Sequence, residues 1–296
     1  MLKKKSLGQN FLKDKNIVSA IVRAGDVHSS DVVVEVGPGE GVMTEVLLQT
    51  AGRVIAIEKD HRLIPILQEK FAEEIKNGKL ELIEKDILDC NIEKLLVVPD
   101  LDAVRGGKGN GRGGVDNYGD ENISVSNKEM RQRWSYKVVA NIPYYITGQI
   151  IRMFLESDNQ PETMVLLVQK EVAERIIARD EKESLLSLSV KIFGEPKLVR
   201  TVGRGAFSPQ PNVDSAVLLI EKISKQKLDG VDEKFFFTIL HAGFAHKRKQ
   251  LLPNLSGLYS KDILLGAFEN CGIEQKARAE DVPLDKWVKL CKSLSR

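Results

Sequence analysis

The chain has 296 residues, 42% of them hydrophobic, which suits a globular protein of one large domain or two modest ones. Its 44 Lys and Arg nearly balance 42 Asp and Glu, so net charge alone does not demand a polyanionic partner. Cys90, Cys271 and Cys291 lack metal-ligand spacing, and apolar runs such as 164–168 are too short to cross a bilayer. We therefore expect a cytoplasmic, monomeric protein with reduced thiols, no metal and no membrane span.

In the first two thirds of the chain, short β-branched runs alternate with amphipathic stretches. After an amphipathic helix at 16–25, strands are expected at 31–36, 53–57, 80–83, 137–140 and 164–168, and helices at 42–49, 61–75, 146–155 and 171–178. Strands and helices that alternate over short connections predict an α/β fold with a doubly wound parallel sheet.

The last third changes character. Two more strands, at 198–202 and 213–220, flank a Pro-rich loop, and beyond Lys225 the pattern is wholly helical, with helices expected at 235–244, 261–271 and 284–294. We predict one domain over residues 1–222 and a small all-helical domain over 223–296.

The alternation stops between Pro99 and Trp134. Seven glycines fall between Arg105 and Gly119, among charged residues and few large apolar ones, so residues 99–134 are predicted to be a flexible insertion. Its two Arg-Gly-Gly pieces are similar to RNA-contacting segments, although a solvated loop is the favoured interpretation.

A glycine-rich loop follows the first predicted strand. Gly37, Gly39 and Gly41 stand between that strand and the next helix, where open α/β sheets bind ligands. Without Cβ atoms, these residues allow a ligand to approach the backbone. The third glycine comes one residue too early for a dinucleotide fingerprint, and Val42 takes its place, so the loop does not favour NAD.

Two carboxylates follow the next two strands. Glu58 ends the second strand, 21 residues beyond Gly37, where a carboxylate can accept hydrogen bonds from ribose hydroxyls. Asp86 follows the third strand and can accept a hydrogen bond from an adenine amino group. Its alternative role is the N-cap of the short helix expected at 92–96. Together with the glycine loop, these residues predict a site for a nucleoside-bearing cofactor.

The tetrapeptide Asn141-Ile142-Pro143-Tyr144 follows the fourth strand. The side-chain carbonyl of Asn141 and the main-chain carbonyl of Ile142 can each accept a hydrogen bond from an amine. Pro143 has no N–H of its own, and Tyr144 offers a ring on which a base can stack. The segment therefore favours methyl transfer to the exocyclic amine of a base, although its composition would also suit a simple strand-ending turn.

Several segments, in the same order, resemble the ribosomal RNA adenine N6-dimethyltransferases, and among them the KsgA/RsmA family. These segments are residues 7–12, 34–39, 139–146, 207–217, 244–251 and 278–280. The resemblance covers nearly the whole chain outside the insertion. It implies a Rossmann-like S-adenosylmethionine-dependent methyltransferase sheet followed by a small helical RNA-binding domain.

The resemblance also implies a substrate and a reaction. It indicates dimethylation of the N6 amines of two adjacent adenosines in the 3′-terminal hairpin loop of 16S rRNA, within a pre-ribosomal particle, as part of small-subunit biogenesis. The cofactor would be S-adenosyl-L-methionine. Its binding residues would be Gln9, Asn10 and Leu12 as a cover, Gly37 at the methionine part, Glu58 at the ribose, Asp86 with Ile87 at the adenine, and Asn141 near the reacting centre, with Gly39 and Lys59 also in the cofactor site.

On the substrate side, Asn141 and Ile142 would hold the amine of a flipped adenosine, with the base between Tyr144 and Phe207. Phe207 is expected on an exposed loop because prolines follow it closely, and a buried core position is the alternative. RNA phosphates would be contacted by Lys247, Arg248 and Lys249.

Other functions share parts of this pattern. A large-subunit (23S) rRNA adenine methylase of the antibiotic-resistance type has the same glycine loop and tetrapeptide, but residues 278–283 and the Phe207 loop favour the small-subunit enzyme. A non-catalytic RNA-binding assembly factor would have no use for the intact amine-binding segment. A DNA adenine methylase has less support from the C-terminal region.

Overall fold

The computed structural model describes residues 10–96 and 135–295. The predicted insertion at 99–134, and Gln9, lie outside the described residues. The strands are β1 (Phe11–Leu12), β2 (Val32–Val36), β3 (Arg53–Glu58), β4 (Leu80–Glu84), β5 (Tyr136–Asn141), β6 (Thr163–Gln169), β7 (Glu195–Val202), β8 (Phe207–Ser208) and β9 (Ser215–Glu221). The α-helices are α1 (Lys15–Ala24), α2 (Val42–Thr50), α3 (Ile64–Lys70), α4 (Ala72–Lys76), α5 (Ile92–Leu95), α7 (Thr147–Leu155), α8 (Lys170–Ile177), α9 (Leu185–Lys191), α10 (Glu233–Gly243), α11 (Leu251–Leu255), α12 (Lys261–Cys271) and α13 (Leu284–Leu294).

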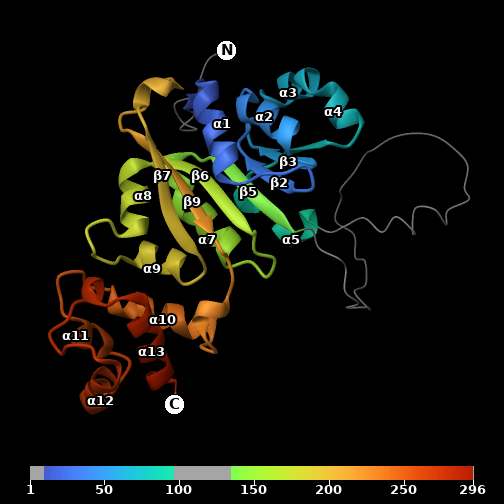
Figure 1. Cartoon of the computed structure of the whole chain (residues 1–296). Coiled ribbons are helices and arrows are strands. Elements are labelled where there is room, and N and C mark those ends of the chain that lie inside the picture. Colours follow the sequence, from blue (N-terminus) through green and yellow to red (C-terminus); the bar gives the residue numbers. More distant parts are fainter. Residues whose placement is uncertain (1–9, 97–134, 296) are drawn as a thin grey trace, which may run out of the picture.

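Seven strands form one twisted sheet in the order β4-β3-β2-β5-β6-β9-β7 (Figure 1). The first five of these strands are parallel, whereas β9 runs antiparallel to both β6 and β7. The predicted Rossmann-like sheet is confirmed, and the two strands expected at 198–202 and 213–220 extend it as an antiparallel pair at one edge. No α-helix intervenes between β7 and β9, and an antiparallel pair needs no helical crossover.

The strand order reverses between β2 and β5. From β2 the chain proceeds outward to β3 and β4 and then returns to β5 on the other side of β2. Val36 at the end of β2 is paired with Ala140, one residue before the end of β5. Gly37 and Asn141 are thus brought to the same edge of the sheet, at the switch point where α/β sheets bind ligands.

The core lies on both faces of the sheet. Alternate residues of β2 divide between two buried clusters: Val32 and Val34 pack with residues of α7, and Val33 packs with residues of α1 and α2. Because all five residues of β2 are buried, helices cover the strand on both faces, which explains why its sequence does not alternate between apolar and polar.

The helix expected at 61–75 is two helices, α3 and α4, separated at Phe71. Helix α3 begins only at Ile64, since Pro65 fits the first turn of a helix, and Phe71 leaves helical geometry at φ −116° and ψ 30°. The Phe71 ring is buried where a Cβ atom on Gly41 would come within 2.6 Å of it. The break in the helix thus coincides with the packing of the Phe71 ring against the glycine loop.

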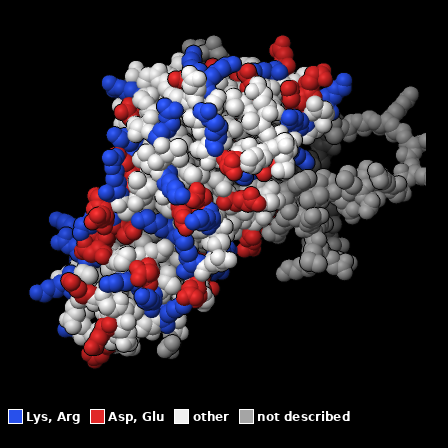
Figure 2. All heavy atoms as spheres, in the orientation of Figure 1, with Lys and Arg blue, Asp and Glu red and all other residues white. Residues whose placement is uncertain are grey.

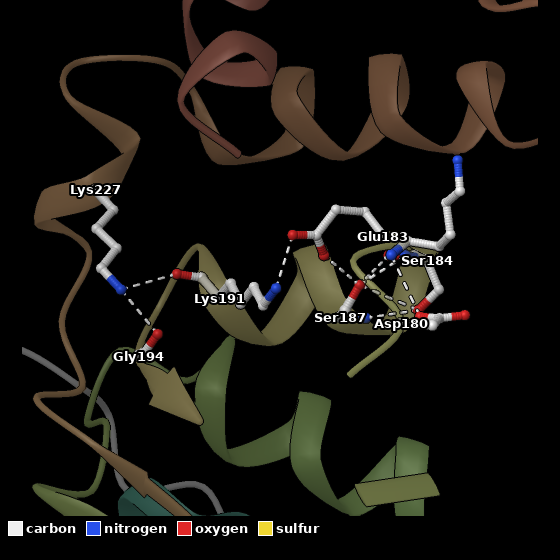
Figure 3. Close-up of polar contacts among 8 residues, drawn as sticks. Asp180, Glu183, Ser184, Ser187, Lys191, Gly194 and Lys227 are labelled. Carbon is white, nitrogen blue, oxygen red and sulfur yellow. Dashed lines mark hydrogen bonds and ion pairs between the residues drawn. The ribbon is translucent and has the colours of Figure 1, made fainter. Parts of the chain in front are cut away.

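Helix α9 was not predicted, and it joins the sheet to the C-terminal helices. It begins with a reciprocal cap, in which Ser187 N–H donates to Ser184 Oγ at 3.0 Å and Ser184 N–H donates to Ser187 Oγ at 2.7 Å. Figure 3 shows Lys227 reaching the other end of α9, where its Nζ donates to the carbonyls of Lys191 at 3.1 Å and Gly194 at 2.8 Å. A cation at a helix C-terminus satisfies carbonyls that the helix leaves unpaired.

The C-terminal helices α10–α13 gather at one end of the sheet, beside α9 (Figure 1). The chain changes from strand to helix after β9 ends at Glu221, close to the boundary predicted between residues 222 and 223. One buried cluster nevertheless extends from the sheet to α13, and the rings of Phe193 and Phe237 stack at 6.0 Å between the two parts. The division into two domains remains a prediction.

All three cysteines are free thiols. Within residues 10–96 and 135–295, no group of three or more His, Cys, Asp or Glu side chains is placed to hold a metal ion. None of the described helices has the length and apolar character needed to cross a membrane.

Candidate active site

The glycine loop has a backbone that only glycine adopts without strain. Gly37, Gly39 and Gly41 have φ values of +70°, +60° and +75°. A Cβ atom on Gly39 would come within 2.8 Å of the Phe11 ring, whereas one on Gly37 would meet only the main-chain oxygen of Asn141, at 4.0 Å. The backbone of Gly37 therefore borders open space, as a ligand-binding cradle requires.

Glu58 lies beside this loop and is 6% exposed. One carboxylate oxygen accepts a hydrogen bond of 3.1 Å from Gly39 N–H, and the other accepts one of 2.8 Å from Asp60 N–H. Burial raises the pKa of Glu58, although the two backbone N–H groups act to lower it. Since each carboxylate oxygen has a second lone pair, Glu58 can still accept hydrogen bonds from a ligand.

Asp86 forms an ion pair with Lys59 across the same pocket. Lys59 Nζ lies 2.5 Å from Asp86 Oδ2, and Asp86 Oδ1 accepts a hydrogen bond of 3.1 Å from Leu88 N–H. Partial burial acts to raise the pKa of Asp86, but the Lys59 ammonium and the Leu88 amide together lower it. Asp86 thus caps the short 3₁₀ turn η2 (Ile87–Asp89), and the alternative prediction that it caps the helix near 92–96 is wrong. Asn91 caps that helix.

Asn141 is the last residue of β5, and its side chain is held by the start of the described chain. Its Nδ2 donates a hydrogen bond of 3.0 Å to the main-chain carbonyl of Asn10. Because the amide nitrogen is engaged, the side-chain carbonyl oxygen is the atom left to accept a hydrogen bond from a ligand. The next residue, Ile142, is buried, and its N–H donates to Leu167 O at 3.4 Å.

Tyr144 begins the 3₁₀ turn η3 (Tyr144–Ile146), and its hydroxyl lies 2.6 Å from Ser215 Oγ on β9. Burial raises the pKa of Tyr144, although the hydrogen bond with Ser215 acts to lower this pKa. The hydroxyl contact fixes the ring, which is half-buried and borders the pocket.

These side chains surround one open pocket, whose empty volume of about 910 Å³ includes the solvent at its mouth. Ten of the predicted site residues line it: Asn10, Gly37, Gly39, Glu58, Lys59, Asp86, Ile87, Asn141, Ile142 and Tyr144. Leu12 lines a smaller cavity on the other side of Gly37 and Asn141. Lining residues for which no role was predicted include Phe11, Lys85, Leu88 and Tyr145, and each of these four is next in sequence to a predicted site residue.

Phe207 is buried, although the prolines after it predicted an exposed loop. It is only 5% exposed and does not line the pocket. The reason is a long-range pairing that the local sequence does not reveal: β8 pairs antiparallel with β1, with Phe207 opposite Leu12, and both side chains join a buried cluster.

Lys247, Arg248 and Lys249 are exposed in the turn between α10 and α11, away from the pocket. Lys247 borders a groove between this turn and the chain from α8 to α9. On the face drawn in Figure 2, basic and acidic side chains are interspersed, so the face has no field of a single sign.

Glu35 is a buried carboxyl group beneath the glycine loop that the motif analysis did not assign. It is 0% exposed, and among the described residues no group meets its carboxyl oxygens in good hydrogen-bond geometry. Burial raises the pKa of Glu35 to about 8, because a low-dielectric surrounding disfavours the ionised form, although the neighbouring Thr44 hydroxyl acts to lower this pKa.

The whole chain, residues 1–296, matches the protein family described as Ribosomal RNA adenine dimethylase. A protein of Dehalococcoides mccartyi named Ribosomal RNA small subunit methyltransferase A is 40% identical over 290 residues, covering 97% of this chain and 87% of the relative. A Bacillus cereus protein of the same name is 34% identical over 298 residues, covering 98% of this chain and 91% of the relative.

Solved structures have the same fold. A dimethyladenosine transferase from Plasmodium falciparum matches with a TM-score of 0.72 at 24% identity, over 95% of each chain. The 23S rRNA methyltransferase ErmE matches with a TM-score of 0.70 at 23% identity, over 97% of this chain and 100% of its own. At these identities, both similarities concern the fold alone.

Proposed function

The chain belongs to the ribosomal RNA adenine dimethylase family, and we propose that it methylates the N6 amines of two adjacent adenosines in the 3′-terminal hairpin loop of 16S rRNA. The methyl donor in this proposal is S-adenosyl-L-methionine, and the reaction takes place in the cytoplasm on an assembling small subunit. The observation that carries the proposal is the position of Asn141, whose amide oxygen is left as an acceptor beside the glycine loop.

The residues of the pocket fit the methyl donor. Gly37 would offer a backbone without a Cβ atom to the methionine part, the Glu58 carboxylate would offer acceptors to the ribose, and Asp86 with Ile87 would border the adenine. Asn10 lines the same pocket, whereas Leu12, which lines the adjoining cavity, and Gln9 are assigned to the cofactor by resemblance. When bound, the cofactor supplies a methyl group on a positively charged sulfur atom.

Asn141 and Ile142 act on the substrate amine as acceptors. A hydrogen bond to Asn141 Oδ1 and another to the Ile142 carbonyl would engage both N–H bonds and direct the nitrogen lone pair toward the methyl group. This is catalysis by alignment, since the displacement requires in-line geometry more than a strong base.

Tyr144 provides a face for the target base, and its ring is held for that purpose by Ser215. The second face predicted for the base is Phe207. Because that ring is buried against Leu12, a sandwich with Tyr144 requires Phe207 to leave the core when the substrate binds.

The small subunit is favoured over the large subunit as the substrate. Relatives that are 34% and 40% identical over nearly the whole chain are named for the small subunit, whereas the 23S rRNA methyltransferase is similar only at the level of the fold. In this proposal, Lys247, Arg248 and Lys249 contact RNA phosphates, which supply affinity rather than sequence recognition.

The test is transfer of labelled methyl groups from S-adenosylmethionine to undermethylated small subunits, with large-subunit rRNA and DNA assayed in parallel. We expect label in small-subunit rRNA, recovered as N6,N6-dimethyladenosine. Label confined to large-subunit rRNA would instead assign the resistance-type activity. No label in any substrate, with cofactor binding intact, would support a non-catalytic RNA-binding role.

A further inference from the structure

Four exposed side chains surround the mouth of the pocket, and we call them the rim: Lys59, Lys85, Leu88 and Tyr145. Tyr145 is 63% exposed, the highest value among the large apolar side chains that the structure describes, and Leu88 is 39% exposed. Large apolar groups left in water at the edge of a pocket indicate a surface that a ligand covers.

The orientation of Tyr145 follows from its place in the 3₁₀ turn. Tyr144 is tied to Ser215, and Ile146 packs partly buried against the core. A 3₁₀ turn has about three residues per turn, so three consecutive side chains point in three different directions. With Tyr144 and Ile146 directed toward the protein, Tyr145 faces solvent at the mouth of the pocket.

The rim also carries positive charge. Lys59 is 56% exposed and is held at 2.5 Å from Asp86, and Lys85 is exposed one residue before Asp86. Exposed aromatic rings next to cations are the pattern that binds single-stranded nucleic acid, in which bases stack on the rings and phosphates lie near the cations.

Building on the proposed function, we infer that Tyr145 stacks on the base of the nucleotide adjacent to the target adenosine, with Lys85 near the connecting phosphate. Of the residues assigned to the cofactor, Glu58 and Ile87 lie in the inner wall of the pocket and are 6% and 4% exposed, whereas Lys59 lies at the rim. Tyr145 lies outside that wall, so its ring is available to the RNA. Two adjacent adenosines suit this arrangement, because each can occupy the pocket while its neighbour occupies the rim.

The test compares Tyr145→Ala with wild type on undermethylated small subunits. Loss of one base–aromatic stack should raise KM for the subunits on the order of tenfold. The Kd for S-adenosylmethionine, measured by calorimetry on the same protein, should stay within about twofold because the ring does not contact the cofactor. Tyr145→Trp should restore KM, since it retains an aromatic ring.

Ile66→Ala is the matched control, because Ile66 is 42% exposed on α3 and does not line the pocket. It should leave both KM and Kd unchanged. An unchanged KM in Tyr145→Ala would overturn the inference, and so would weaker cofactor binding in that variant, which would assign the ring to the cofactor. Absence of methylation by the wild-type protein would overturn the proposed function itself, and this inference with it.

Discussion

Asn141 Nδ2 donates a 3.0 Å hydrogen bond to the main-chain carbonyl of Asn10, joining residues 131 positions apart in the chain. The bond ties the segment before α1 to the end of β5, at the point where the strand order of the sheet reverses. It also orients the Asn141 amide, because one N–H bonds within the protein and the carbonyl oxygen is left as an acceptor for the substrate.

Asn141→Ala should separate catalysis from cofactor binding. Without the side-chain acceptor, the amine is no longer aligned, and we expect methylation to fall about a hundredfold or more, as misplacement of reacting groups can cost. The Kd for S-adenosylmethionine should change by only a few fold. Methyl transfer to small subunits and calorimetric titration of the cofactor check the two expectations. Near-normal turnover would remove Asn141 from the proposed role.

Glu58→Ala should weaken cofactor binding directly. The variant loses the proposed ribose acceptor and the hydrogen bond from Gly39 N–H that holds the glycine loop, so we expect Kd for S-adenosylmethionine to rise on the order of tenfold or more. Glu84→Ala is the matched control, because Glu84 is paired with Glu58 in the neighbouring strand but is exposed and outside the pocket. Equal affinities of the two variants would exclude Glu58 from the cofactor site.

Glu35 should make the stability of the protein depend on pH. Its folded pKa of about 8 exceeds the ordinary value of 4.5, so between these values the native state holds a proton that the unfolded state has lost. The free energy of unfolding therefore falls as pH rises through this window, by at most about 1.4 kcal/mol per pH unit. Glu35→Gln removes the titrating group, and its stability relative to wild type should be higher at pH 8 than at pH 5.

Urea unfolding at several pH values from 5 to 8 measures this difference. Glu45→Gln on α2 is the control, because interaction with Lys15 lowers the pKa of Glu45 and places its titration below the window. If the free energies of unfolding of the Glu35→Gln variant and the wild type differed by the same amount at every pH, Glu35 would not be the titrating group.

Replacement of Lys247, Arg248 and Lys249 by alanine should weaken binding to small subunits without changing cofactor affinity. If all three contact phosphates, the slope of log affinity against log salt concentration should become shallower by about 2–3, since each lost contact removes most of one released counterion. Binding measured over a salt series checks the slope, with Lys76→Ala on α4 as a control. An unchanged slope would exclude this turn from the RNA interface.

Local patterns sufficed for much of the fold and of the pocket. The β-branched runs predicted the strands of the sheet, and glycines that all take positive φ marked the loop after β2. Asn141 was expected at the end of a strand, and it is the last residue of β5. These features depend on the backbone preferences of short segments and on how those segments alternate. Both are determined by residues that are neighbours in the sequence.

Contacts between distant segments were not predictable in the same way. Phe207 was expected in water but is buried, because β8 pairs with β1. The helix expected at 61–75 is interrupted where Phe71 packs on the glycine loop, and Asp86 forms its ion pair with a residue of another segment.

The sequence by itself thus determined the alternation of strands and helices that builds the main sheet, the glycine loop and the residue types that the chemistry needs. Only the tertiary structure decided which strands pair, which carboxylates are engaged and which rings reach the pocket. The physical reason is that backbone conformation follows from nearby residues, whereas burial and hydrogen-bond partners depend on segments that meet only after folding.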